Sequence, residues 1–389
     1  MVAAVRSGES LRSVARRFGV SLSTVQRWLG RAKGRRLDRT DFSDHPRGPR
    51  HAANRTPLEV EERILAVRAQ LKQHSDLGEY GALAIVRTLA GEGFVPLPSV
   101  RTVGRILERR GMVEGQRRIR FTAPARGWYL PEVAQGLDEL DSFDVIEALA
   151  IKNGPHFEVF SCISLHGGLA GAFVVHPSVT AKAAVSGLEA YWRDVGLPGY
   201  AQFDNDARFQ GPHGRKHQDV LSRVVRMCLS LEVAPVFVPP RETGFQAQIE
   251  NLNGQWQQKV WQRFVFENLE QLKAQSARYI AAKRSHGAVR QEAAPDRRPF
   301  PTEWRLDLQT TPRGRLIFIR RTNDAGEVRL LERVFTVDPY WTRKLVRCEV
   351  DLDAHRLRCF ALRRRAPAEQ PLLADIPYRL MRRGRPFHE

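Results

Sequence analysis

Residues 137–237 alternate short apolar runs with turns and helical segments, and this order limits the possible folds more than any other feature of the chain. Three apolar runs, LDELDSFDVIEAL, HFEVFSCISL and GGLAGAFVV, follow one another with turns between them, as neighbouring strands of one sheet do. A helical pattern at 181–195, the strand GYAQFDND, a second helical pattern near 220–231 and the strand VAPVFV come next. We therefore expect an α/β domain with the order β-β-β-α-β-α-β-α.

The length and composition of the chain indicate a folded protein of several domains. Its 389 residues are 42% hydrophobic and 27% charged, which is typical of globular proteins and sufficient for two or three domains. The sequence has neither an apolar run of about 18 residues nor the apolar core of a signal peptide, so we expect no membrane span and no secretion. The cysteines lack a metal-binding spacing, and we expect reduced thiols at Cys162, Cys228, Cys348 and Cys359.

Positive charge is concentrated at the two ends of the chain. The chain carries 62 Lys and Arg against 43 Asp and Glu, a net charge of +19. Residues 1–130 hold 25 basic and 12 acidic side chains, residues 131–300 hold 18 and 19, and residues 301–389 hold 19 and 12. Arginine outnumbers lysine 53 to 9, and its guanidinium group suits bidentate contacts with phosphate and guanine. The charge therefore favours a nucleic acid as the partner.

The segment SLRSVARRFGVSLSTVQRWLGRAK, residues 10–33, predicts two helices joined by a tight turn. Ser10 and Ser21 stand where N-caps are expected, and Gly19 supplies the turn. The apolar residues of each helix share one face, which leaves a polar and basic face on the second helix. This spacing resembles the helix-turn-helix of prokaryotic transposases and repressors, whose second helix reads the major groove. The residues expected to contact DNA are Ser23, Thr24, Gln26, Arg27 and Arg31.

A second helical unit is expected at 57–113, after a linker at 36–56 that is rich in charge, proline and glycine. Its three helical patterns begin with LEVEERIL, ALAIVRT and SVRTVGRIL. The last pattern has a polar face over an apolar core, so we expect a second DNA-reading helix of helix-turn-helix or winged-helix type. A purely packing role for this unit is the alternative. The residues of the expected reading face are Arg101, Thr102 and Arg105.

Alternating strands near the C-terminus predict a small β-barrel of four or five strands at 310–366. Its runs LIFIRR, EVRLLERVFTV, KLVRCEVDLD and HRLRCFAL are separated by turns at NDAGE, DPYW and DLDAH. We expect a basic tail at 367–389, a basic linker at 114–131 and the α/β core at 132–300. With the helix-turn-helix unit at 1–35, the chain is expected to be a multidomain α and α/β protein.

Three acidic residues of the core stand where folding can bring them together. Asp141 lies within the first strand, Asp204 at the end of the fourth, and Glu250 near the start of a later helix. Strand ends and the first turn of a helix can meet at one sheet edge, where like charges repel unless cations lie between them. Such a trio can hold two Mg²⁺ ions, or Mn²⁺ in their place. Spacing alone does not single these three out of the 19 acids in residues 131–300.

The motifs around these acids do single them out. LDSFD, AQFDND and ETGFQAQIENLNGQW resemble the three motifs of the retroviral-integrase-type DDE transposases found in many bacterial insertion sequences. The resemblance implies an RNase H-like core in which Asp141, Asp204 and Glu250 are the catalytic metal ligands. It also implies that two asparagines, Asn205 and Asn253, orient the carboxylates or contact DNA.

Some positions near the motifs leave alternatives open. Asp144 lies on the other face of the first strand and is the alternative first ligand, with Asp141 preferred. Glu242 is nearer the usual spacing from the second aspartate, but the residues PPRETG around it resemble the loop before the catalytic helix. Position 257 is glutamine where the family often has a basic residue, and Lys259 would point away on an ideal helix.

The resemblance implies a transposase that binds the terminal repeats of a mobile element. It would cleave DNA and transfer the freed strand to target DNA by the DDE two-metal mechanism. The implied partners are double-stranded DNA and further copies of the chain in a synaptic complex, with no membrane, and the location is the bacterial cytoplasm with the nucleoid. The alternative is a non-enzymatic, sequence-specific DNA-binding regulator derived from a transposase.

Overall fold

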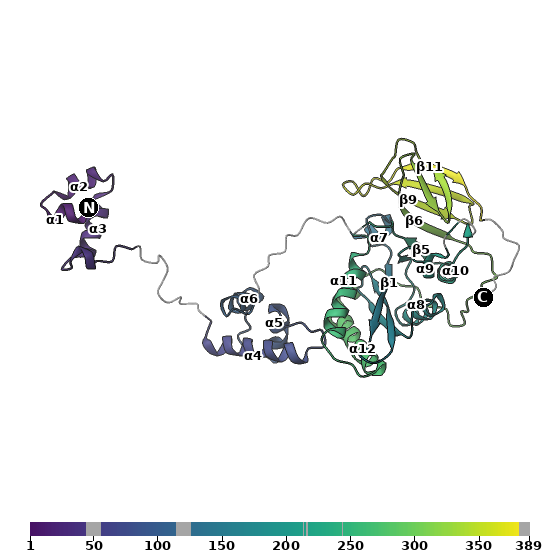
Figure 1. The fold of residues 1–389 in the computed structure, drawn as a ribbon, viewed down its shortest axis with the longest axis horizontal. Coiled ribbons are helices and arrows are strands. Elements are labelled where there is room, and N and C mark those ends of the chain that lie inside the picture. The colour runs from purple at the N-terminus through teal and green to yellow at the C-terminus, as the bar shows by residue number, and fades with distance from the viewer. Residues whose placement is uncertain (44–55, 114–125, 213, 215–216, 243, 381–389) are drawn as a thin grey trace. The chain divides into compact units, whose positions relative to one another are not determined.

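Figure 1 shows the fold of the computed structural model, with the helices of the N-terminal unit drawn in purple. Two of these helices begin at serine caps. The hydroxyl oxygens of Ser10 and Ser21 each accept a hydrogen bond, at 3.2 Å, from the backbone N–H three residues further on. Val14 and Val25 are fully buried where the two helices pack. The expected helix-turn-helix is confirmed. Its elements are α1 (Val2–Arg6), α2 (Leu11–Arg17), α3 (Leu22–Ala32) and the 3-10 turn η1 (Leu37–Arg39).

The chain divides into two compact units, Met1–Arg63 and Ile64–Glu389. The residues that the structure describes are 1–43, 56–113, 126–212, 214, 217–242 and 244–380. Large parts of the two expected linkers and the end of the expected basic tail therefore lie outside the described residues.

Three further helices precede the core. The hydroxyl oxygen of Ser99 accepts a hydrogen bond from the Thr102 backbone N–H at 3.1 Å and so begins the third of them. One face of this helix is buried through Val103 and Ile106, whereas its arginines lie on the opposite face. The elements are α4 (Leu58–His74), α5 (Ala82–Gly91) and α6 (Val100–Arg109).

Nine strands within the described residues form one mixed sheet, in the order β11-β10-β9-β6-β5-β4-β1-β2-β3. The first three strands pair antiparallel, and β4 and β5 then add to β1 in parallel through helical crossovers. The expected α/β core is therefore confirmed. Its strands are β1 (Leu140–Ala150), β2 (His156–Ser164), β3 (Ala170–Val175), β4 (Tyr200–Phe203) and β5 (Ala234–Phe237). The helices between and before them are α7 (Pro131–Ala134), α8 (Ala181–Val195), α9 (Ala207–Gln210) and α10 (Arg223–Ser230).

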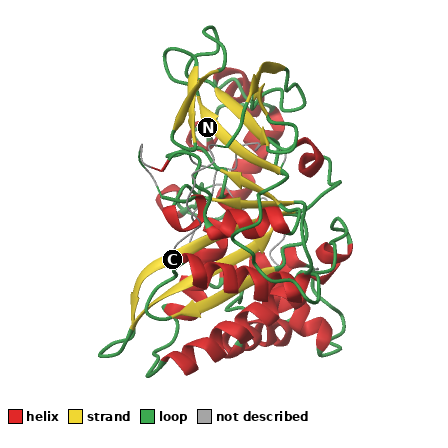
Figure 2. Cartoon of the chain, turned by 90° about the vertical axis from the view of Figure 1, so that its right-hand side faces the viewer, coloured by secondary structure: helices red, strands yellow, loops and turns green. Residues whose placement is uncertain are grey.

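Helices cover both faces of this part of the sheet (Figure 2). Helices α8 and α10 bury aromatic residues such as Phe143 and Trp192 against one face. Helices α11 (Ala247–Trp256) and α12 (Leu269–His286) pack against the other face, where Ile146 lies. Because successive side chains of a strand point to opposite faces, residues one apart on β1 meet different helices. A π-helical turn at Gln257–Trp261 and the short α13 (Ala288–Glu292) complete this face.

The C-terminal strands extend the core sheet. Strand β6 pairs with β5 in parallel, with Phe318 opposite Phe237, and β9, β10 and β11 then follow in antiparallel order. The prediction of a small β-barrel at 310–366 is therefore corrected. The C-terminal strands belong to a sheet that is not closed, because β6 pairs with β5 of the core. A separate hairpin accounts for two further strands. The strands are β6 (Arg315–Arg321), β7 (Glu327–Leu330), β8 (Arg333–Thr336), β9 (Leu345–Asp351), β10 (Arg356–Ala361) and β11 (Leu372–Pro377).

Two further expectations concern the cysteines and the helices. All four cysteines are buried with free thiols. Of the helices in the described residues, none is both long enough and apolar enough to cross a bilayer.

Candidate active site

Backbone register places Asp144 and Asp204 next to each other. Strands β1 and β4 run parallel, and each β1 residue lies opposite the residue 60 positions later in the chain. The phenyl rings of Phe143 and Phe203, which come one residue before the two aspartates, stack with 5.2 Å between their centroids. The register therefore continues to the end of β4. Asp144 and Asp204 consequently lie at the same edge of the sheet.

Glu250 is the third acid of this group. It lies exposed in the first turn of α11, a helix that packs on β1 and β2. Burial, and then the negative charges of Asp204 and Glu250, raise the pKa of Asp144 to about 6. Like charges raise a pKa in this way when the carboxylates are neighbours. Asp144, Asp204 and Glu250 therefore lie in the same region of the molecule.

A hydrogen-bonded chain holds the Asp144 carboxylate in place. The side-chain amide of Asn253 donates to Asp144 Oδ2 at 2.7 Å. The Ser161 hydroxyl donates to Asn253 Oδ1 at 2.6 Å and thereby fixes which end of the amide faces the acid. Asn253 is only 9% exposed, so the geometry places it against the carboxylate rather than on a surface that DNA could reach. Its position one turn after Glu250 explains how it reaches Asp144.

The loop after β4 surrounds Asp204 with polar groups. The Asp206 backbone N–H donates to Asp204 Oδ1 at 3.1 Å, and the Asp206 side chain begins α9. Arg208 forms ion pairs with Asp206 at 2.8 Å, with Glu158 at 3.3 Å and with Glu147. Burial and the Asp206 charge raise the pKa of Asp204, while the Arg208 charge opposes them. Aspartate at position 206 therefore serves as a helix cap and as the partner of Arg208.

Asn205 has a structural role. Its side-chain amide donates to the Val238 carbonyl oxygen at 2.7 Å, and its oxygen accepts from the guanidinium of Arg320 at 2.7 Å. It thus joins the end of β4 to β5 and β6.

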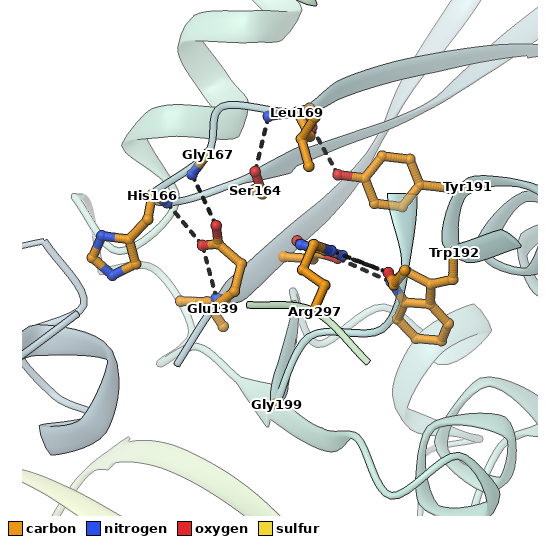
Figure 3. Close-up of polar contacts among 12 residues, drawn as sticks. Glu139, Ser164, His166, Gly167, Leu169, Tyr191, Trp192, Gly199 and Arg297 are labelled. Carbon is orange, nitrogen blue, oxygen red and sulfur yellow. Dashed lines mark hydrogen bonds and ion pairs between the residues drawn. The ribbon is translucent and has the colours of Figure 1, made fainter. Parts of the chain in front are cut away.

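Asp141, the preferred first ligand, lies on the opposite face of β1. Its fully buried carboxylate accepts two hydrogen bonds from the Arg297 guanidinium, at 3.0 and 2.6 Å, and one from the Trp192 indole N–H at 3.0 Å. Figure 3 shows Arg297 beside Trp192. Because Asp141 and Asp144 are three residues apart on one strand, they point to opposite faces. The structure therefore does not bring Asp141 together with Asp204 and Glu250.

The other acid near the third motif, Glu242, also lies outside the group. Its carboxylate pairs with Arg321 of β6, and with Arg364 at 3.7 Å. These ion pairs hold the loop before α11 against the C-terminal strands. Glu242 therefore tethers this loop, while Glu250 on the helix faces Asp144.

The donors of Asp144, Asp204 and Glu250 suit a metal in kind. Three carboxylates suit a hard divalent cation, because such a cation would relieve the repulsion that, after burial, raises the pKa of Asp144. In the described part of the chain, no group of three or more His, Cys, Asp or Glu side chains is placed to hold a metal ion. These three residues therefore fit the ion by their chemistry, and their oxygens would have to come closer together to share it.

The residues expected to read DNA divide into exposed and anchored side chains. Gln26 and Arg27 are exposed on α3, whereas Arg31 stacks on Trp28 with its guanidinium carbon 4.6 Å from the ring centroid. Thr24 shares a 2.8 Å hydrogen bond with the cap Ser21 and is half-buried. Three more expected residues, Ser23, Arg101 and Arg105, are exposed, and Thr102 is half-buried beside its cap.

Comparison with known proteins identifies one segment. Residues 1–40 match the family model of the Homeodomain-like domain. Among solved structures, the chain is similar to the catalytic core domain of HTLV-2 integrase in complex with magnesium, at 12% identity over 40% of this chain and 86% of that one, with a TM-score of 0.26. It is also similar to a simian T-cell lymphotropic virus intasome in complex with PP2A regulatory subunit B56 gamma, at 14% identity over 74% and 91%, with a TM-score of 0.33. Likenesses as slight as these two carry no argument about this chain.

Proposed function

We propose that the protein is a DNA-binding polynucleotidyl transferase of the transposase and integrase type. The observation that supports the proposal is the register of β1 and β4, which sets Asp144 beside Asp204, together with the pKa of Asp144, which burial and then the charges of Asp204 and Glu250 raise to about 6. A buried acid whose charge is opposed by two neighbours is typical of a catalytic site. In this proposal Asp144 takes the place that the sequence motif favoured for Asp141.

Asp144, Asp204 and Glu250 are the residues that would hold the metal, two Mg²⁺ ions or Mn²⁺ in their place. When bound, the metal would supply charge to activate a water or 3′-hydroxyl nucleophile and to stabilise the leaving oxygen. Asn253 keeps one oxygen of Asp144 in a fixed direction. Arg208 offsets part of the negative charge of the acids beside Asp204, namely Asp206, Glu158 and Glu147.

DNA recognition is assigned to the N-terminal unit. A Homeodomain-like segment with an exposed polar face on α3 suits the major groove. The proposed ligands are the terminal repeats of a mobile element, and the proposed product is a strand joined to target DNA. Because two element ends take part in one reaction, we propose that the active form contains more than one copy of the chain.

The test is cleavage and strand transfer by the full chain. A duplex is first selected from a random pool by binding, and is then incubated with the protein and Mg²⁺ or Mn²⁺. We expect nicked and joined products that disappear in Asp144→Asn and Glu250→Gln. Glu242→Gln is the matched control, since Glu242 pairs with Arg321 outside the acidic group, and it should keep activity.

The opposite outcome is also informative. If the selected duplex binds tightly but neither metal yields a nick, the catalytic proposal is wrong and the chain is a DNA-binding regulator. If Asp141→Asn abolishes cleavage without changing stability while Asp144→Asn is active, the assignment of the first ligand is wrong.

A further inference from the structure

A cavity of about 1110 Å³ is lined by residues of α11 and α12, and Glu250 is one of them. Its lining contains four lysine or arginine side chains against two acidic ones, Glu250 and Glu79. Along α11 the wall is polar, and Gly254 leaves open space where a side chain would begin. A cavity with more cationic than acidic side chains, which also includes Glu250 of the proposed site, suits a polyanion whose reacting bond lies at Glu250.

Lys283 of α12 is the cation best placed for such a ligand. Its ammonium donates to the Gln255 side-chain oxygen at 2.7 Å, a neutral partner. Two other cations of the wall donate to backbone groups: Lys259 to the Gly78 carbonyl oxygen at 2.8 Å, and Arg290 to the carbonyl oxygens of Leu165 and His166. Burial lowers the pKa of Lys283, so an anion that entered the cavity would stabilise its charge.

Glu79 is an acidic residue that shares this cavity with Lys283. It lies in the segment between α4 and α5 and lines the same cavity. Lys283 and Tyr279 line this cavity too, and, beside the effect of burial, the Glu79 charge acts to raise the pKa of both. The segment is held there by Lys259, by Arg263, whose guanidinium donates to the Ser75 carbonyl oxygen at 2.5 Å, and by Leu77 against the apolar core.

We propose that this cavity binds the sugar-phosphate backbone of one DNA strand beyond the reacting bond, with Lys283 as a phosphate contact and Glu79 in the place of that phosphate when DNA is absent. Glu250 and Gln255 are five residues apart on α11, about 8 Å along the helix axis. At about 3.4 Å per nucleotide step of one strand, the cavity takes roughly two nucleotides beyond the site. The inference rests on the proposed function for its choice of ligand.

The test is amine footprinting of the full chain by mass spectrometry. Lysines are acylated with and without a short duplex that has a recessed end, in the absence of divalent metal. We expect DNA to slow the modification of Lys283 several-fold. Lys273 is the matched control, since it lies on the same helix, is exposed and pairs with Glu270, and its modification should not change.

A second arm tests Glu79. Glu79→Gln removes the competing charge, so we expect Lys283 to be protected at a lower DNA concentration than in the unchanged chain. Equal modification of Lys283 with and without bound DNA overturns the proposal, as does protection that is the same in Glu79→Gln.

These results are separable from those of the catalytic test. Cleavage with an unprotected Lys283 overturns this inference alone. Protection of Lys283 without cleavage in either metal supports the binding site and overturns the proposed catalysis.

Discussion

The Asn253 side-chain amide donates a 2.7 Å hydrogen bond to Asp144 Oδ2. Asp144 belongs to the motif LDSFD and Asn253 to the motif ETGFQAQIENLNGQW. We predict that Asn253→Ala lowers the affinity of the site for Mg²⁺, because one oxygen of Asp144 loses its fixed direction. Loss of a residue that orients a ligand typically costs about 10- to 100-fold in metal affinity or activity. The measurement is the cleavage rate as a function of Mg²⁺ concentration.

The Mg²⁺ dependence distinguishes orientation from a general structural effect. We expect the half-saturating Mg²⁺ concentration to rise in Asn253→Ala and to stay unchanged in Lys273→Ala, an exposed position of α12. A lower maximal rate at an unchanged Mg²⁺ dependence would contradict the orienting role.

The buried pair of Asp141 and Arg297 predicts a large effect on stability. The Asp141 side chain is 0% exposed and that of Arg297 is 10% exposed. Arg297→Ala leaves a buried carboxylate without its cation, which costs about 3–5 kcal/mol of the free energy of unfolding. Urea denaturation measures this loss. Lys273→Ala, which breaks an exposed pair with Glu270, should cost less than about 1 kcal/mol, and similar losses in the two variants would contradict the prediction.

The raised pKa of Asp144 predicts how stability varies with pH in the absence of metal. Its pKa is about 6 in the folded chain against 3.8 for the unperturbed acid, so the folded state holds the proton more tightly. The stability that this proton contributes is complete below pH 3.8 and is lost as the pH rises to about 6. The upper limit of this loss is about 3 kcal/mol.

Asp144→Asn removes the titrating group, and this provides the measurement. Denaturation midpoints of the unchanged chain, compared with those of Asp144→Asn, should fall more steeply between pH 4 and pH 6. Parallel curves over that interval would show that Asp144 does not titrate there. Added Mg²⁺ should flatten the difference, because a bound cation favours the ionised acid.

Local patterns predicted the helices and the core strands well. The caps Ser10, Ser21 and Ser99 each begin a helix because a cap acts on backbone groups within three residues. Local patterns did not predict how the C-terminal strands pair. Their alternation of apolar and polar residues suits a barrel and an extended sheet equally well. The pairing of Phe237 with Phe318 depends on residues 81 positions apart in the chain, and no local pattern encodes it.

The candidate site shows the same division between local and long-range information. The second and third motifs predicted that Asp204 follows a strand and that Glu250 lies near the start of a helix, and the structure has both acids at these places. Their catalytic role stays a prediction. The choice between Asp141 and Asp144 depended on which face of β1 the helix α11 covers, and this is set by packing across the sheet. Arg297, which neutralises Asp141, lies outside all three motifs, so the motifs do not indicate its role.

The exposed face of α3 predicts a loss of DNA affinity without a loss of stability. Arg27 is exposed, and we expect Arg27→Ala to weaken binding of the selected duplex by about 1–3 kcal/mol if it contacts a base. If Arg27 contacts a phosphate, about one counterion fewer is released on binding, so the slope of log affinity against log salt concentration should become less steep by about one. Fluorescence anisotropy at several salt concentrations measures both. Arg36→Ala is the control, since Arg36 pairs with Asp38 at 3.3 Å; equal losses in both variants would argue against reading by α3.

The pairing of β6 with β5 predicts that the C-terminal strands are required for the core to fold. Strand β6 covers the edge of β5, and the rings of Phe237 and Phe318 stack with 5.2 Å between their centroids. A chain that ends at residue 312 would expose this edge and its aromatic surface, so we expect it to aggregate. Size-exclusion chromatography and thermal denaturation of the shortened chain measure the effect. A monomer with an unchanged midpoint would mean that the C-terminal strands fold as a domain of their own.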